Sequence, residues 1–310
     1  MNNKEKNMYN EERKRQYIAS KKGSRTFETN MENWFDKTEP YESAHNKDVS
    51  DLEIAEIINL YTEVINTPSI LYLELIHSTL RDYVRWANPG NKSYELMSRE
   101  MVAMCVDKDR ERQRIILRDQ LLHDLDYYLR NSFEKAILLA LFEGIKLKDF
   151  EYLTKDQIDE ENGVVYLSGR TLRVSPNLIR YMIDAANTYE INAYNDSPQY
   201  TISKFVELWE DDKRVIKQMA AFTESDRMTR YRNIIKRCHD IIQCDWVSAS
   251  ELPQSGIVNL LYEEWKRQPN KSITDIAKEK TKEIQERYNR TWVYNVPFKK
   301  KYGYLFAKRN

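Results

Sequence analysis

The stretch AILLALFEGIKLKDFEYLTKDQID (136–159), followed by VVYLSGRTLRVSP (164–176), decides the fold. Its first part is an apolar run typical of a buried helix, and Gly144 is a residue type that commonly ends one. Further on, the apolar spacing changes from 3.6 to two, and an Asn-Gly and a Ser-Gly pair supply turns. We therefore expect a buried helix followed by short antiparallel strands at 164–167 and 172–174.

Helical periodicity continues on both sides of this stretch. Upstream, apolar residues recur at helical spacing after Asp51, after Pro68 and over residues 94–106. Downstream, the pattern is helical again from Asn177 onward. The 310 residues include only 7 Gly and 8 Pro, which favours helices over a sandwich or barrel. The expected fold class is mainly α with a small antiparallel β-sheet.

The polar segment DKDRERQR (107–114) separates two periodic regions and predicts a linker. Residues 46–106 are expected to form a compact helical domain. Residues 115–310 are expected to form a second domain with a basic C-terminal tail. Residues 1–45 are polar and basic, with a short helix expected at 9–19 and a mobile segment after it.

The charged residues are segregated along the chain although the net charge is zero. There are 49 basic and 49 acidic residues, yet residues 287–310 contain seven basic residues and no acidic one. Acidic residues gather elsewhere, for example in DQIDEEN and ELWEDD. Such segregation allows a neutral protein to present a basic face to a polyanion.

Several functional classes are disfavoured by composition. No apolar run approaches the roughly 20 residues of a membrane span, and the polar start has no signal-peptide core, so we expect a cytoplasmic protein. Three cysteines, an odd number, argue against a disulfide framework. Cys238, His239 and Cys244 fit no common zinc spacing, and no phosphate loop is present. We expect neither a metal nor a cofactor.

In their order, these segments resemble the tyrosine recombinases, or phage integrases. The stretch that opens this section is similar to the family's Thr-Gly-Leu-Arg box and to its Gly-Lys hairpin with the Arg-x-Val-Pro that follows. SASELPQSGIVNLLYEEW (248–265) is similar to the His-x-Leu-Arg box, and TLRDYVRWA (79–87) to a helix of the core-binding domain. More narrowly, the chain resembles the integrase-like master repressors that hold SPbeta-type phages in lysogeny. The resemblance runs from about residue 45 to the end. It implies a helical core-binding domain and a degenerate catalytic domain that clamp double-stranded DNA.

The resemblance also implies that the catalytic set is broken. Recombinases attack a phosphodiester with a tyrosine oxygen, while cationic groups stabilise the charge that develops. Here Lys146 stands at the first arginine, Arg170 at the hairpin lysine, Ser250 at the first histidine and Pro253 at the second arginine. Proline has no side-chain donor, and losing one such donor costs on the order of 100- to 1000-fold.

The nucleophile has two candidates, Tyr288 and Tyr294, and the sequence does not choose between them. With 21 tyrosines in the chain, a tyrosine in this region is weak evidence for chemistry. No residue is therefore assigned a catalytic role.

Basic residues that could still hold DNA remain. In TRYRNIIKRCHDII (229–242) the isoleucines are expected to face inward, and Arg227, Arg230 and Arg237 outward. The full set of expected DNA contacts is Arg81, Arg85, Lys146, Arg170, Arg173, Arg227, Arg230, Arg237, Lys299 and Lys300.

The resemblance, together with the broken catalytic set, implies a DNA-binding repressor on an inactive recombinase scaffold, with phage operator sites as its partner. Two alternatives stay open. One is an active but divergent recombinase, which a cleavage assay would separate from a repressor. The other is an accessory protein that does not bind DNA, which a gel-shift experiment would reveal.

Overall fold

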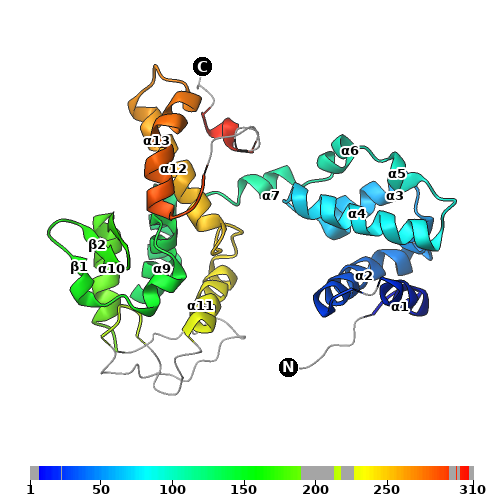
Figure 1. The fold of residues 1–310 in the computed structure, drawn as a ribbon, viewed down its shortest axis with the longest axis horizontal. Coiled ribbons are helices and arrows are strands. Elements are labelled where there is room, and N and C mark those ends of the chain that lie inside the picture. Colours follow the sequence, from blue (N-terminus) through cyan, green and yellow to red (C-terminus); the bar gives the residue numbers. More distant parts are fainter. Residues whose placement is uncertain are drawn as a thin grey trace. The chain divides into compact units, whose positions relative to one another are not determined.

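The chain forms two compact units that divide between Arg112 and Gln113. The computed structural model describes residues 7–21, 23–189, 213–217, 227–292, 298 and 301–306. The regular elements described are helices apart from one small sheet (Figure 1). The prediction of a mainly α fold with a small antiparallel sheet is confirmed.

The first unit packs its helices around an aromatic core. The rings of Tyr17, Phe35 and Tyr83 meet edge to face, with centroids 5.0, 5.1 and 6.5 Å apart. Such pairs add stability beyond the area that they bury. The elements are α1 (Glu11–Ser20), α2 (Arg25–His45), η1 (Val49–Asp51), α3 (Ile54–Asn59), η2 (Leu60–Ile65), α4 (Ile70–Ala87), α5 (Ser93–Leu96), α6 (Arg99–Met104) and α7 (Lys108–Arg112).

The segment after residue 20 is largely helical, so the prediction of a mobile segment there is wrong. α2 has 21 residues, and its Met31, Phe35 and Tyr41 are buried at helical spacing. Polar residues surround these positions, so the apolar face of α2 is narrow and is hard to recognise in the sequence. A narrow apolar face is nevertheless enough to pack a helix against its neighbours. A buried ion pair also anchors the segment. Lys14 Nζ lies 2.5 Å from Glu42 Oε2, joining α1 to α2, and both side chains are fully buried.

The second unit is built around α9 (Ser132–Glu143). Every residue from Ala136 to Glu143 is buried, because α8, α10, α11 and α12 all pack against this helix. The remaining elements of the unit are α8 (Arg118–Tyr128), η3 (Leu147–Glu151), η4 (Lys155–Gln157), β1 (Ile158–Asp159), β2 (Val164–Leu167), β3 (Arg170–Arg173), α10 (Pro176–Ala186), α11 (Arg227–Ile242), α12 (Glu251–Arg267), α13 (Ile273–Tyr288) and η6 (Gly303–Phe306).

The sheet has the order β1-β2-β3, with both pairings antiparallel. Leu167 pairs with Arg170 across a two-residue turn, and Gly169 takes a φ of 77°, which suits glycine. β2 occupies the predicted residues. β3 begins two residues earlier than predicted, because this tight turn extends the pairing to Arg170. In the part of the chain that is described, no helix is both long and apolar enough to cross a membrane.

Candidate nucleic-acid interface

Several of the positions that the resemblance matches to recombinase catalytic residues lie around the C-terminal end of α9. Gly144 ends this helix with a φ of 99°, and the chain then turns to bring Lys146 beside α13. The Lys146 ammonium donates a hydrogen bond of 2.8 Å to the carbonyl oxygen of Asn289. Partial burial, together with the neighbouring Arg170 guanidinium, lowers the pKa of Lys146. Positive charge is therefore crowded at this point.

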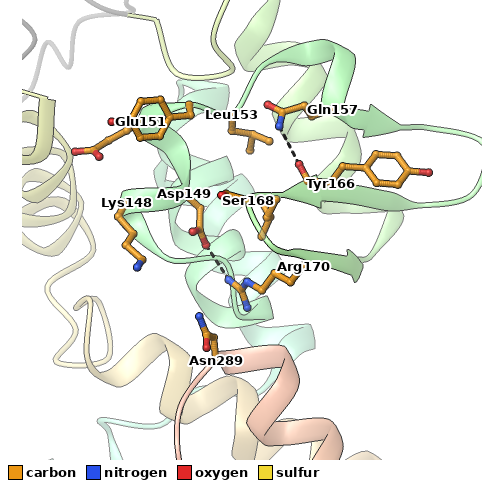
Figure 2. A pocket seen from close by; sticks show the side chains of 11 residues that line it. Lys148, Asp149, Glu151, Leu153, Gln157, Tyr166, Ser168, Arg170 and Asn289 are labelled. Atoms are coloured by element: carbon orange, nitrogen blue, oxygen red, sulfur yellow. Dashed lines mark hydrogen bonds and ion pairs between the residues drawn. The ribbon is translucent and has the colours of Figure 1, made fainter.

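Arg170 projects from β3 into the same region. The donors of its guanidinium are bound by acceptors of the protein itself. It donates 2.5 Å to the Arg287 carbonyl, 3.0 Å to the Gly144 carbonyl and 2.7 Å to Asp149 Oδ2. Figure 2 shows Asp149 and Asn289 on either side of this guanidinium. The Arg170 side chain is only 14% exposed. We interpret Arg170 as a structural residue whose hydrogen bonds join β3 to the C-terminal ends of α9 and α13.

Tyr288 is one of the two candidate nucleophiles, and it is buried. Its side chain is 4% exposed, and its hydroxyl donates a hydrogen bond of 2.8 Å to the carbonyl oxygen of Phe142. Burial raises the pKa of this hydroxyl well above its usual value. A nucleophile must reach its target and lose its proton, and this environment opposes both. The other candidate, Tyr294, lies outside the described residues.

Gly256 allows α12 to approach this tyrosine. A Cβ at Gly256 would lie 1.8 Å from the carbonyl oxygen of Phe142 and 2.2 Å from the Tyr288 hydroxyl. Both distances are impossible contacts, so only glycine fits. The packing that buries Tyr288 is therefore encoded in α12 as well as in α13.

Pro253 lies in the first turn of α12 and lines a pocket of about 400 Å³ together with Lys146 and Tyr288. The structure thus brings three of the aligned positions together. Arg290 also lines this pocket, and burial lowers its pKa. Ser250 precedes the helix and is exposed.

α11 packs its isoleucines against the core as predicted, but its arginines are not where the prediction placed them. Arg227 is buried, Arg230 donates to the backbone carbonyl of Lys217, and Arg237 forms an ion pair with Glu134 of α9. The prediction that these three arginines face outward is wrong. The isoleucine stripe was assigned correctly, but the arginines flank it, and their long side chains reach back to the protein.

The solvent-facing side of α11 consists of Thr229, Arg232, Asn233 and Lys236. These residues are three and four apart and so share one face of the helix. We call them the outer face of α11. Arg232 and Lys236 have no hydrogen-bond or ion-pair partner among the described residues. Both belong to the basic run of the sequence, and their helical spacing from the buried Ile234 and Ile235 is the sequence signal that places them on the outer face.

Two family models match the sequence and together span most of it. The model of the MrpR N-terminal core-binding domain matches residues 8–89, and that of the MrpR C-terminal catalytic domain matches residues 117–303. The chain belongs to the MrpR family. The resemblance stated from the sequence is confirmed at this level, since the two matched domains are a core-binding and a catalytic domain.

Solved structures similar to this MrpR-family chain include a recombinase and a phage integrase. The crystal structure of XerA recombinase is 12% identical, covers 96% of this chain and 98% of its own, and has a TM-score of 0.33. The integrase from mycobacterium phage Brujita is 14% identical, covers 94% and 96%, and has a TM-score of 0.32. No curated protein matches the sequence.

The other basic residues predicted to contact DNA differ in whether their side chains already have partners within the described part of this MrpR-family chain. Arg81 on α4 is half-buried and has no hydrogen-bond or ion-pair partner in the described part of the chain. Arg85 is exposed and pairs with Asp82 at 3.6 Å and Glu95 at 2.8 Å. The Arg173 side chain is exposed on β3. Lys299 and Lys300 lie outside the described residues.

Sequence reasoning missed two cations near the C-terminal end of α9. Lys148 is exposed on the rim of a pocket of about 560 Å³ that Arg170 also lines (Figure 2). Arg287 donates 3.0 Å to the Glu143 carbonyl and 2.8 Å to the Arg173 carbonyl. Only the fold places these residues beside α9. In the described residues no cluster of three or more His, Cys, Asp or Glu could hold a metal ion.

Proposed function

We propose that this chain is a sequence-specific repressor that binds double-stranded DNA on a recombinase scaffold and does not cleave it. Its sites would be phage operators, and its role would be to maintain lysogeny, as the resemblance implies. The observation that carries the proposal is the buried Tyr288 hydroxyl, whose proton is donated to the Phe142 carbonyl. Membership of the MrpR family supports the scaffold.

The geometry around Tyr288 supports a loss of strand cleavage. Cleavage needs a mobile tyrosine oxygen and cationic donors aimed at the non-bridging phosphate oxygens. Arg170 has three protein acceptors, and Pro253 contributes no side-chain donor. The groups around this centre satisfy one another. A phosphate brought here would find charge nearby but few donors free to follow its reaction.

DNA binding is supported by cations that have no hydrogen-bond or ion-pair partner within the described part of the chain. Among the described residues, these include Arg81 in the first unit and Lys148, Arg173, Arg232 and Lys236 in the second. A phosphate contact made by such a side chain breaks no internal hydrogen bond. Its contribution to affinity comes with counterion release and therefore falls with salt.

We assign recognition of the DNA sequence to the outer face of α11. An α-helix fits the major groove, where arginine pairs with guanine and asparagine with adenine through two hydrogen bonds each. Arg232 and Asn233 supply these two side-chain types, and Lys236 adds a phosphate or guanine contact one turn later. A protein that reads bases without cutting can stay on its operator and exclude polymerase.

A binding selection tests the proposal. The full chain is used to enrich duplexes from a randomised library, and affinity is then measured for the enriched duplex and a shuffled one at several salt concentrations. We expect enrichment of a defined sequence. Arg232→Ala should reduce the difference in binding free energy between the enriched and the shuffled duplex by about 1–3 kcal/mol. Failure to enrich or shift any duplex would favour an accessory protein that does not bind DNA.

Lys282→Ala is the matched control, because Lys282 is an exposed lysine of α13 that pairs with Glu286 at 3.8 Å. It removes one positive charge from the same unit. It should leave both affinities unchanged. If Arg232→Ala behaves like this control, the outer face of α11 does not read DNA.

A further inference from the structure

We infer that Arg237 is a positioning residue, which sets the orientation of α11 for sequence reading through its ion pair with Glu134. This inference rests on the proposed function. It assigns to Arg237 a role different from the direct base contact that the sequence suggested.

The pair is buried and fully engaged on the carboxylate side. Arg237 Nη2 contacts Glu134 Oε1, with side-chain exposures of 13% and 0%. The other carboxylate oxygen accepts a hydrogen bond of 3.0 Å from Asn131 Nδ2. The guanidinium carbon lies 5.8 Å from the centre of the Phe133 ring, within range for a cation–π contact. Arg237 is thus held by both a charge and an aromatic ring of α9.

The place of Arg237 on the helix gives the pair its consequence. Residue 237 follows Lys236 directly and lies one turn beyond Asn233, so it borders the outer face of α11. Arg230 lies on the same flank two turns earlier and is bound to the Lys217 carbonyl. Contacts of Arg230 and Arg237, two turns apart, therefore fix one side of α11 to the rest of the unit. A rotation that moved Asn233 or Lys236 out of register would have to break these contacts.

The chemistry explains why an arginine is needed. A carboxylate that is completely buried is costly unless it is paired, so Glu134 strongly favours the position in which Arg237 reaches it. The planar guanidinium can face the carboxylate and stack on the ring together, which a lysine ammonium cannot do. An apolar contact alone would allow α11 to slide, whereas this pair has one geometry.

The test compares Arg237→Met, Arg237→Lys and Glu134→Gln in the full chain. The measured quantity is the ratio of dissociation constants for the shuffled duplex and for the duplex that wild type enriches. This ratio does not depend on the fraction of folded protein, so a purely structural loss of stability leaves it unchanged. The slope of affinity against salt is measured on the same samples. Lys282→Met serves as the charge-removal control.

We expect Arg237→Met and Glu134→Gln each to lower the ratio at least about fivefold, with the salt slope unchanged. Arg237→Lys should recover part of the loss, and it also carries the test if Arg237→Met does not fold. A loss with Arg237→Met but not with Glu134→Gln would mean that Arg237 touches DNA itself and would overturn the inference. So would a salt slope flattened by about one, which indicates a phosphate contact.

Different results would contradict the proposed function and the positioning role of Arg237. If wild type enriches no sequence, the proposed function fails, and the positioning role falls with it. If wild type discriminates strongly and all three variants keep its ratio, only the positioning role of Arg237 is contradicted.

Discussion

The Tyr288 hydroxyl donates its hydrogen bond to the carbonyl oxygen of Phe142, 2.8 Å away in the last turn of α9. Carbonyl groups in the last turn of a helix lack partners within the helix, so this bond satisfies one of them. It also joins α13 to α9. A tyrosine in this position serves the fold of the second unit.

Tyr288→Phe should destabilise the protein, because it leaves the buried Phe142 carbonyl without this donor. We expect a loss of roughly 1–2 kcal/mol in the free energy of unfolding, with unchanged DNA affinity. Denaturant titration measures the loss. Tyr152→Phe is the control, since Tyr152 is 73% exposed, and it should change little. Equal stability of both variants would contradict a structural role for Tyr288.

Gly256→Ala should be far more damaging than its one added methyl group suggests. The new Cβ would meet the Phe142 carbonyl at 1.8 Å, and α12 would have to move away from α9. We expect a loss of about 3 kcal/mol or more. Gly303→Ala is the comparison, because nothing lies within 4 Å of a Cβ there. A melting temperature for Gly256→Ala close to that of Gly303→Ala would show that α12 does not pack as described.

Arg170→Ala and Arg173→Ala should separate structure from DNA binding on the same strand. Arg170 has three protein acceptors, so its loss should cost about 2 kcal/mol or more of stability. The Arg173 side chain is exposed, so its loss should leave stability within about 0.5 kcal/mol. It should instead flatten the salt slope of DNA affinity by about one. If Arg170→Ala instead flattened the salt slope and left stability unchanged, Arg170 would be a phosphate ligand after all.

The first unit should lose stability in mild acid through His77. Burial and the nearby Arg81 guanidinium lower the pKa of His77, and its ring Nδ1 lies 2.9 Å from the Tyr61 hydroxyl. The unfolded chain binds a proton near the ordinary pKa of 6.5, while the folded chain resists protonation until lower pH. Stability therefore falls as the pH drops below about 6.5.

His77→Gln should reduce this pH dependence. The comparison is the change in thermal midpoint between neutral and mildly acidic buffer, for wild type and variant. Whatever the thermal midpoint of the variant at neutral pH, that midpoint should move less on acidification than the midpoint of wild type. An identical shift in both proteins would assign the acid sensitivity to other groups.

Much of the fold could be predicted from local patterns. The apolar run ended by Gly144 is a helix, and the Ser-Gly turn forms the hairpin, because neighbouring residues decide both. α2 was missed because its apolar stripe is narrow and is recognisable mainly once Tyr17 and Tyr83 pack against Phe35. Local polarity is a poor guide where tertiary packing supplies most of the stability of a helix.

The site was predicted less well, for a physical reason. Sequence placed Arg230 and Arg237 on a basic helix, but their contacts depend on Lys217 and Glu134, which lie outside this helix, 13 and 103 residues away. Likewise the role of Arg170 depends on Asp149 and on backbone carbonyls that the fold brings together. A pattern of charges shows which residues can bind phosphate. It does not show which ones the protein already occupies.

This MrpR-family chain is proposed to bind DNA without cutting it. The most direct measurement incubates wild type with the enriched duplex, nicked near its centre so that any cleaved strand is trapped, and divides each sample between native and denaturing gels. We predict a shifted band on the native gel and no protein–DNA band on the denaturing gel. A band that survives denaturation and disappears with Tyr288→Phe or Tyr294→Phe would contradict the account.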